Sequence, residues 1–513
     1  MHKLSKKLFY IPMAVALMAT AIAGCSKNDY KQDYNPLIDD PQKEQEEVPR
    51  QTSSMNEQYR PQIHFTPSQN WMNDPNGMVF IDGVYHLFFQ YNPKGNDWGN
   101  MSWGHATSPD MIHWTEQPVA LTRDDLGAIF SGSCVIDKDN TAGFGANAMV
   151  ALYTSAGDDG KQQQSIAYST DGGKNFTKYS GTPVIKNDDD NLRDPKVFWH
   201  AESKQWIMSL AKGWKMGIEF YGSKDLKTWS HLSTFVTGLS GRPSLQWECP
   251  DLLEMDYKGG KKWVLIVSVN PGGPILGSGT LYFPGDFDGK EFKADEREYP
   301  LWLDYGMDNY AGVTWSNTGD RRVMIGWMNN WSYAGAVPCS PWRSAMTLPR
   351  ELKLVEFDGK PLLTSTVAKE IEGIAGQWNA AGSGWKAFDA YQLRITVKLD
   401  QNSTITLSNE TGDKLVVEVY GGSKLVAVKR NASTGETSFN GTFSIPSMQG
   451  PLSIEGDSAT LDLFVDQSSV ELLSQDGTLS ITNLVFPTSI YNQLQTSGSV
   501  VDAQVRELSR IWK

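Results

Sequence analysis

The chain has few cysteines, few histidines and a deficit of positive charge. Its 513 residues include 4 Cys and 7 His, and 59 acidic side chains outnumber 46 basic ones, for a net charge of −13. The spacing of Cys134, Cys249 and Cys339 fits neither a zinc site nor a disulfide framework, so we predict small buried residues, no metal and no cofactor. Because phosphate-binding surfaces are basic, the charge also argues against nucleic acid as a partner.

One long apolar run, residues 8–23, follows a lysine-rich start and is too short and too soon interrupted for a stable membrane span. It ends in Ala-Ile-Ala-Gly-Cys25, which resembles a bacterial lipoprotein processing site. We therefore predict a lipoprotein signal peptide at 1–24, lipid on Cys25 and a flexible polar tether at 25–59. The protein would be exported and anchored to a membrane, in the periplasm or at the cell surface. The alternative is an ordinary secretory signal in which Cys25 is incidental.

The composition favours a β-rich globular protein of two or three domains. Hydrophobic residues make up 40% of the chain, there are 47 Gly, and the middle of the sequence has no long helical pattern. The 18 Trp, 19 Tyr and 20 Phe provide flat apolar faces that suit a neutral polyhydroxylated ligand, although many must belong to the core.

Five segments with apolar strand character recur at regular spacing. Counted from Tyr85, Met149, Trp206, Trp263 and Val323, the intervals are 64, 57, 57 and 60 residues. A shorter strand that opens on polar residues precedes each of them, and a Ser-x-Asp turn follows three of them, at 108–110, 169–171 and 223–225. Units of about four antiparallel strands predict a five-bladed β-propeller over 60–350. The alternative, unrelated sheets in a sandwich, would scatter the acidic residues that open three of the units.

The pattern changes beyond about residue 350. Alternating apolar runs separated by Gly, Asn and Ser predict a linker and a β-sandwich over 351–513. No clustered acids accompany these strands, so we expect a supporting role, with secondary sugar binding as the less favoured option.

Three acidic residues share one register at the openings of their units: Asp74 in Trp-Met-Asn-Asp-Pro-Asn-Gly at 71–77, Asp194 in Arg-Asp-Pro, and Glu248 in Glu-Cys-Pro. A propeller would bring them to one pocket. Cleavage of a glycosidic bond needs one protonated and one ionised carboxyl group, and several acids in one pocket can divide those tasks. The apolar neighbours of Glu248 favour a proton donor. The neighbours Asn73 and Arg193 favour ionised Asp74 and Asp194.

These motifs, with Phe-Ser-Gly at 130–132 and Phe-Val-Asp-Gln-Ser-Ser-Val-Glu at 464–471, resemble glycoside hydrolase family 32, the invertase, inulinase and levanase family. The resemblance spans about residues 60–513. It implies a five-bladed propeller, β-D-fructofuranoside substrates and a retaining mechanism. Asp74 would be the nucleophile, Glu248 the acid and base, and Asp194 the stabiliser of the transition state. Retention requires the carboxyl groups of Asp74 and Glu248 to lie about 5 to 5.5 Å apart.

The resemblance also implies a set of substrate contacts: Trp71, Asn73, Gln90, Trp98, Phe130, Ser131, Arg193 and Trp331. Taken singly, Gln90 and Ser131 could instead satisfy strand ends, and Trp98 and Trp331 could be packing residues. Cys134 departs from the Ala that is common in the family, which puts little in doubt because both residues are small.

The favoured function is therefore an exported fructan hydrolase that releases fructose from chain ends, with sucrose as an additional expected substrate. Endo-cleavage of levan or inulin is a close alternative, and a fructosyltransferase is a less favoured one. A surface fructan-binding protein on a retired hydrolase scaffold is a remote alternative, because it need not keep all three acids. The sequence leaves open the linkage preference, the membrane leaflet, the oligomeric state and the disulfide status of the cysteines.

Overall fold

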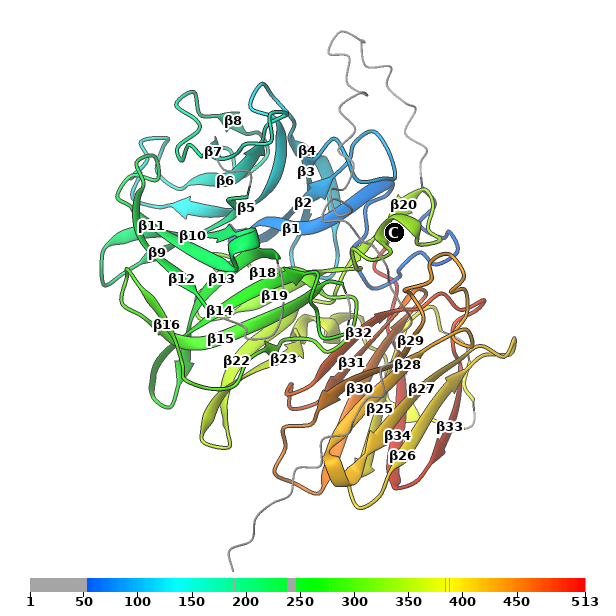
Figure 1. Ribbon diagram of the computed structural model, residues 1–513. Helices are drawn as coiled ribbons and strands as arrows, with labels where there is room; N and C mark the ends of the chain where they lie inside the picture. The colour runs from blue at the N-terminus through cyan, green and yellow to red at the C-terminus, as the bar shows by residue number, and fades with distance from the viewer. Residues whose placement is uncertain are drawn as a thin grey trace, which may run out of the picture. The chain divides into compact units, whose positions relative to one another are not determined.

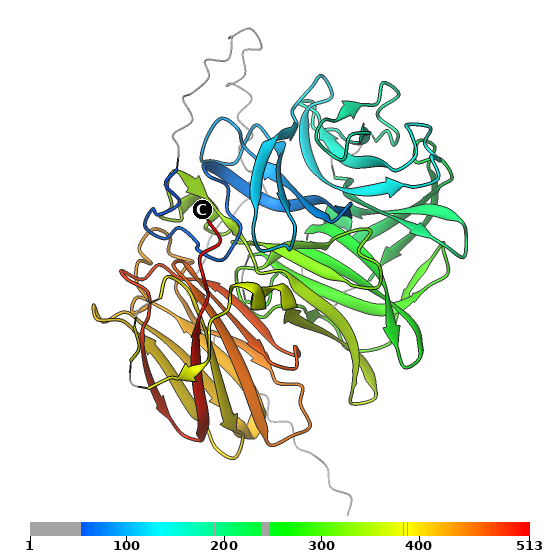
Figure 2. The ribbon, with the colours of Figure 1, turned by 180° about the vertical axis from the view of Figure 1, so that it is seen from behind.

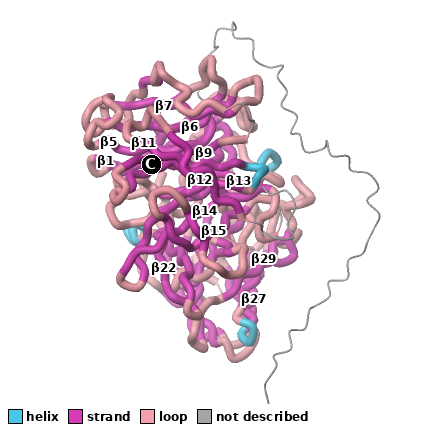
Figure 3. Tube along the Cα trace, turned by 60° about the vertical axis from the view of Figure 1, so that its left-hand side comes forward, coloured by secondary structure: helices cyan, strands magenta, loops and turns pink. Residues whose placement is uncertain are grey.

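The computed structural model describes residues 53–187, 191–237, 246–275, 277–382, 384–386 and 388–512. These residues form strands and short 3-10 turns (Figure 3). The turns are η2 (Gly213–Lys215), η3 (Ala334–Ala336), η4 (Lys369–Ile374) and η5 (Gly421–Ser423). None of the helices in these ranges has the length and apolar character needed to cross a lipid bilayer. The predicted signal peptide and Cys25 lie outside the described residues.

Five antiparallel sheets make up the propeller that the repeats predicted, and they are coloured blue to yellow-green in Figure 1. The first two sheets contain β1 (Asn70–Ile81), β2 (Val84–Tyr91), β3 (Ser102–Ser108) and β4 (Thr115–Leu121), then β5 (Ala128–Asp137), β6 (Ala148–Ala156), β7 (Gln162–Ser169) and β8 (Thr177–Lys178). The third contains β9 (Arg193–His200), β10 (Gln205–Lys212), β11 (Gly217–Ser223) and β12 (Ser230–Val236). The fourth contains β13 (Gln246–Tyr257), β14 (Gly260–Asn270), β15 (Gly279–Phe287), β16 (Phe292–Ala294) and β17 (Leu301–Trp302).

The fifth sheet contains β18 (Tyr310–Thr314), β19 (Val323–Met328), β21 (Ala345–Met346), β22 (Arg350–Phe357) and β23 (Lys360–Val367). It therefore extends to residue 367, past the boundary expected at residue 350, because β22 pairs with β19 through Met324 and Arg350. The β22–β23 hairpin turns at Asp358-Gly359, where both residues have positive φ. Strand β20 (Trp342–Arg343) runs parallel to β1 and joins the end of the repeat region to its first sheet.

The Ser-x-Asp segments form the turns between third and fourth strands that their repetition indicated. In each, the serine hydroxyl donates to the aspartate Oδ1, at 3.0 Å in the first sheet, 2.7 Å in the second and 3.1 Å in the third. The same Oδ1 accepts backbone N–H groups that follow, such as that of His113 at 2.8 Å. A short polar side chain thus closes each outer turn.

Every innermost strand of the propeller carries a β-bulge at the same level. Two residues of the inner strand oppose one residue of its neighbour in each sheet, which bends the strand and re-aims its side chains. The bulged pairs are Asn73-Asp74, Phe130-Ser131, Asp194-Pro195, Cys249-Pro250 and Ala311-Gly312. Asp194, Cys249 and Ala311 have φ values of 63°, 47° and 53°, a left-handed backbone that is uncommon for residues with a side chain.

Residues 379–507 form the sandwich, drawn yellow to red in Figure 1 and seen from behind in Figure 2. One sheet contains β24 (Asn379–Ala380), β34 (Val500–Glu507), β25 (Tyr391–Lys398), β30 (Ser458–Asp466), β31 (Ser469–Ser474) and β32 (Ser480–Leu484). The other contains β29 (Ile445–Pro451), β28 (Leu425–Arg430), β27 (Lys414–Tyr420), β26 (Ser403–Ser408) and β33 (Gln493–Ser497). Alternate residues of both sheets, such as Ile395 and Val417, are fully buried in a common core.

A buried ionic cluster joins the propeller to the sandwich. His64 lies between Asp466 and Glu471, with its ring nitrogens 2.7 Å from one carboxylate oxygen of each. Arg350 of β22 donates to the second oxygen of Glu471 and to Ser480. Although burial alone would lower it, the two carboxylates raise the pKa of His64 to about 9. The ring is therefore charged at neutral pH, and each charged side chain of the cluster has a partner of opposite charge.

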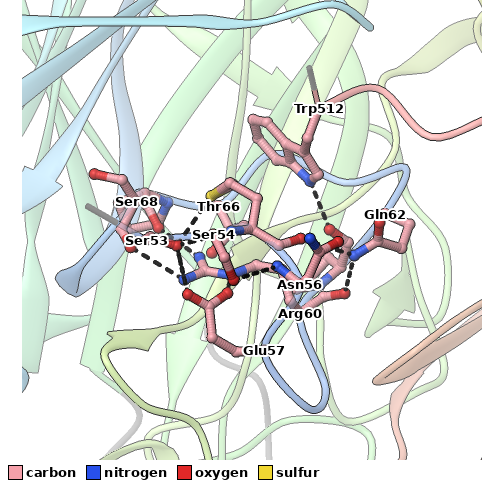
Figure 4. Close-up of polar contacts among 12 residues, drawn as sticks. Ser53, Ser54, Asn56, Glu57, Arg60, Gln62, Thr66, Ser68 and Trp512 are labelled. Carbon is pink, nitrogen blue, oxygen red and sulfur yellow. Dashed lines mark hydrogen bonds and ion pairs between the residues drawn. The ribbon is translucent and has the colours of Figure 1, made fainter. Parts of the chain in front are cut away.

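Residues 53–68 are docked on the folded domains rather than extended away from them (Figure 4). Arg60 donates to Glu57, to the carbonyl of Pro67 and to that of Ser68, and its guanidinium lies 3.6 Å from the ring centre of Trp342. The predicted tether at 25–59 therefore overlaps a bound segment at its end.

Candidate active site

The bulges bring the three predicted acids to one place although β1, β9 and β13 are far apart in sequence. Cys249, next to Glu248, connects them. Its backbone N–H donates to Asp194 Oδ2 at 3.0 Å, and its thiol lies 3.6 Å from both that oxygen and Asp74 Oδ2. The left-handed backbone at Cys249 and Asp194 permits this approach. One residue of the fourth sheet thus touches the acids of the first and third.

Asp74 is held by two donors. Asn73 Nδ2 donates to Asp74 Oδ1 at 3.0 Å, and Ser131 Oγ donates to Oδ2 at 2.8 Å from the neighbouring sheet. Asn73 is itself positioned by the indole N–H of Trp71, which donates to its amide oxygen at 2.7 Å. Trp71 is 1% exposed, so it orients Asn73 from within the core rather than presenting a face to a ligand.

Glu248 is bound by groups from the third and fifth sheets. Arg193 Nη2 and Nε donate to Glu248 Oε1 at 2.5 and 3.1 Å, and Gln246 Nε2 donates to the same oxygen at 3.1 Å. The hydroxyl of Tyr310 donates to Oε2. Sequence context placed Glu248 in an apolar setting, whereas the structure surrounds its carboxylate with these polar donors. Arg193 also makes the expected ion pair with Asp194, with Nε 3.8 Å from Oδ2.

The pocket raises the pKa of two of its acids. Burial and then the charge of Glu248 raise the pKa of Asp74, against the hydrogen bonds from Asn73 and Ser131. Burial raises the pKa of Asp194 to about 7; Arg193 opposes this shift, and the charges of Glu248 and Asp74 add to it. The sequence neighbours therefore do not keep these two acids at ordinary pKa values. Burial and the repulsion between these carboxylates therefore favour the protonated form of Asp74 and Asp194.

Aromatic side chains flank the acids. Trp331 packs on Trp71 with ring centres 5.9 Å apart and an interplanar angle of 26°, and lies 4.8 Å from Trp327. Trp98 is 40% exposed and meets the half-buried Phe130 edge-on at 6.1 Å. Such exposure leaves part of the Trp98 ring available to a ligand.

Gln90 is 3% exposed, and its amide donates to the carbonyl of Ile129 at 3.0 Å, which stabilises the start of β5. Gln90 therefore makes the strand-end hydrogen bond that the sequence analysis gave as the alternative to a substrate contact.

Sequence reasoning assigned no role to Tyr310, Gln246 or Asn191. Asn191 Oδ1 accepts from Arg193 Nη1 at 2.6 Å and so holds the guanidinium from the side opposite Glu248. Tyr310 had a usable signal, because it opens the fifth unit in the register of the three acids. Burial and then the charge of Glu248 raise its pKa, so its hydroxyl stays a donor. Gln246 begins β13 and Asn191 precedes β9, and neither position carries a distinguishing sequence pattern.

The arrangement can perform acid–base and nucleophilic chemistry on a polar substrate. It combines carboxyl groups with raised pKa values, a guanidinium and an amide that donate hydrogen bonds, and aromatic rings at the rim. In the described part of the chain, no group of three or more His, Cys, Asp or Glu side chains could hold a metal ion. Cys134, Cys249 and Cys339 are buried free thiols.

Comparison with known proteins agrees with this geometry. The family model "Glycosyl hydrolases family 32 N-terminal domain" matches residues 64–365, and "Glycosyl hydrolases family 32 C terminal" matches residues 364–511. The levanase of Bacillus subtilis is 42% identical over 495 residues, covering 90% of this chain and 72% of that protein. The extracellular exo-inulinase of Aspergillus niger is 37% identical over 521 residues, covering 88% and 95%.

Among solved structures, exo-inulinase from Aspergillus awamori matches with a TM-score of 0.83 and 34% identity, covering 89% of this chain and 99% of that one. The two family models together span the propeller and the sandwich, and meet at residues 364–365, close to the end of β23. The chain therefore belongs to glycosyl hydrolase family 32 and is a glycoside hydrolase.

Proposed function

We propose that this hydrolase cleaves β-D-fructofuranosidic bonds in fructans such as levan and inulin, releases fructose from chain ends, and also accepts sucrose. The observation that carries the proposal is the meeting of Asp74, Asp194 and Glu248 around Cys249 and Arg193. The similar proteins are a levanase and exo-inulinases, which supports fructan as the substrate class.

In the proposed mechanism Asp74 is the nucleophile. Its carboxylate attacks C2 of the terminal fructose, and the C2–O bond to the rest of the chain breaks as Glu248 gives a proton to the departing oxygen. Glu248 then takes a proton from water, which attacks C2 and releases Asp74. The hydrogen bonds from Asn73 and Ser131 orient Asp74 for attack. Net retention follows from two displacements at one carbon.

Asp194 is proposed to hold sugar hydroxyls and to stabilise positive charge in the transition state. The backbone N–H of Cys249 fixes one of its oxygens, and the backbone N–H of Asp194 is fixed in turn by Thr154 Oγ1 at 3.0 Å. Glu248 is proposed to supply the proton for the first step. Arg193, Asn73, Gln90 and the rim aromatics would bind the terminal sugar.

Product analysis tests the proposal. Purified protein incubated with levan, inulin and sucrose should release fructose alone from both polymers. Oligosaccharides as early products would replace exo-action by endo-action, and binding of polymer without reducing sugar would refute hydrolysis. Asp74→Asn should abolish release. Asp256→Asn changes a carboxylate of an exposed surface pair with Lys261 and serves as the matched control, with unchanged activity.

We also propose that the protein is exported and anchored through lipid on Cys25. The support is the basic, apolar and Ala-Ile-Ala-Gly-Cys sequence at the start of the chain, together with the description of the fungal relatives as extracellular. Labelled fatty acid should enter the parent protein and be absent from Cys25→Ser. An unlabelled parent protein would rule out the anchor.

A further inference from the structure

The propeller has a second cavity, beyond the acids along the same inner strands. It has a volume of about 440 Å³ and is lined by residues 135–139 at and after the end of β5, 196–200 of β9, 251–254 of β13, and 314–319 at and after the end of β18. In each of these strands the catalytic candidates come first and the cavity residues follow. The cavity therefore lies at the other end of the propeller axis, within the size range of small-molecule sites.

A buried ionic plug separates the two sites. Lys196 Nζ donates to Asp251 Oδ2 at 3.0 Å and to the carbonyl of Thr314 at 2.6 Å. The backbone N–H and hydroxyl of Thr314 donate to the same carboxylate oxygen at 2.7 and 2.8 Å. On their strands, Lys196, Asp251 and Thr314 come three or four residues after Arg193, Glu248 and Tyr310. This ionic cluster therefore lies between the acids and the cavity. A ligand in the cavity would be sterically independent of the active site.

The cavity has an aromatic face at its edge. Trp199 is 43% exposed although it lies on a strand, and it meets Trp206 edge-on with ring centres 5.2 Å apart. Trp206 is nearly buried, and its indole N–H donates to Thr141 Oγ1 at 2.9 Å. The supporting ring fixes Trp199 while leaving its face open. A large exposed indole beside a cavity is a typical ligand-stacking surface.

The rim of the cavity carries polar side chains that have no hydrogen-bonding partner within the described part of the protein. In the described ranges, the exposed side chains of Lys138, Asp139 and Glu202 make no hydrogen bond or ion pair. By contrast, Asp137 is engaged by the backbone N–H groups of Thr141 and Ala142. Acidic and basic groups alternate around the opening, which disfavours an anion. Unused carboxylate acceptors beside an indole face match a ligand that has both hydroxyl groups and C–H faces.

We propose that this cavity is a second carbohydrate site, which binds a neutral sugar of one to three units. A ring face of the sugar stacks on Trp199, and its hydroxyls donate to Asp139 and Glu202. The choice of fructose units as the ligand rests on the proposed function. The site would hold a branch or distal segment of a long fructan while a chain end occupies the pocket with the acids.

The test is calorimetric titration of the full protein carrying Asp74→Asn, so that the sugar is not consumed, with fructose and with a fructo-trisaccharide. Two binding events are expected. Trp199→Ala should weaken one at least tenfold and leave the other, while Trp199→Phe should retain both. Trp214→Ala is the matched control, because Trp214 is 52% exposed but does not line the cavity, and the event that depends on Trp199 should persist.

A single event that survives Trp199→Ala would overturn the second site. So would an event sensitive to Trp199 that appears with spermidine and not with sugar, because the cavity would then be a cation site. In protein with the native acids, Trp199→Ala should leave kcat and KM for sucrose unchanged and raise KM for long fructan. If native protein hydrolyses no fructan, the proposed function fails, but the titrations still decide the second site.

Discussion

Ser131→Ala is expected to move the acid limb of the pH–activity profile upward. The Ser131 hydroxyl donates to Asp74 Oδ2 at 2.8 Å and opposes the burial and the Glu248 charge that raise the pKa of Asp74. Removing the hydroxyl leaves that opposition to Asn73 and the more distant thiol of Cys249. Asp74 must be ionised to attack, so activity would be lost at a higher pH than in the parent.

The size of the shift follows from the hydrogen bond. A bond to a charged group contributes about 1.5–3 kcal/mol, and 1.36 kcal/mol corresponds to one pKa unit. Because one donor and the thiol remain, we expect a shift near the lower end, about one pH unit. The plateau of kcat should fall less than the rate below the limb, since Asp74 is ionised in both proteins at higher pH.

The assay is initial-rate measurement of kcat and kcat/KM on sucrose across the acid range. Ser133→Ala is the matched control on the same strand, because Ser133 donates to the carbonyl of Pro195 and touches no acid. An acid limb of kcat that stays in place in Ser131→Ala would refute the reasoning, and a raised KM alone would mean that Ser131 only binds sugar. Equal shifts in both variants would attribute the effect to packing of β5 on β9.

Three further changes have defined outcomes. Glu471→Gln leaves His64 and Arg350 without their shared buried partner and should cost about 3–5 kcal/mol in the free energy of unfolding, measured by urea titration at pH 7; a loss below about 1 kcal/mol would contradict this. Burial lowers the pKa of His86 to about 4 and of His105 to about 3. Their contribution to stability is therefore complete above pH 6.5, the pKa of an unfolded histidine, and is lost as the pH falls. Urea midpoints should decrease from about pH 6.5 to about pH 4, and a flat profile would show that these histidines do not contribute. Glu248→Gln should lower kcat on fructan by about 10²–10⁴-fold with binding retained, and loss of binding instead would show a structural role.

Much of the fold was accessible from the sequence because its signals are local and repeated. The apolar core strands recur in all five sheets and the Ser-x-Asp turns in three of them, and the predicted core strand at Tyr85 is β2. The boundary at the end of the propeller was harder to predict. Strands β22 and β23 are half-exposed and charged, so their pattern does not distinguish the last sheet from a linker. Only pairing with β19, a tertiary contact, assigns them.

The candidate active site could likewise be predicted only in part from the sequence. The positions of Asp74, Asp194 and Glu248 follow from their shared register, which a local pattern carries. Their electrostatic neighbours follow only in part, because the fold adds partners that are distant in the sequence. Arg193 pairs with Asp194, its neighbour in the chain, and also with Glu248, 55 positions away. Adjacent residues are therefore an incomplete guide to protonation in this pocket.

The five aligned bulges make the geometry of bond cleavage independent of the route by which polymeric substrates reach the acids. The reacting carboxyl groups sit on the innermost strands, whose distortions are fixed by contacts with neighbouring sheets. The peripheral turns that join second to third strands, such as residues 92–101 with Trp98, lie at the same end of the strands as the acids and make few contacts with the interior. Length changes in those peripheral turns can remodel the route by which polymers arrive without disturbing the geometry of bond cleavage. Libraries that diversify the peripheral turns alone should therefore yield enzymes with new polymer preferences and an unaltered catalytic step.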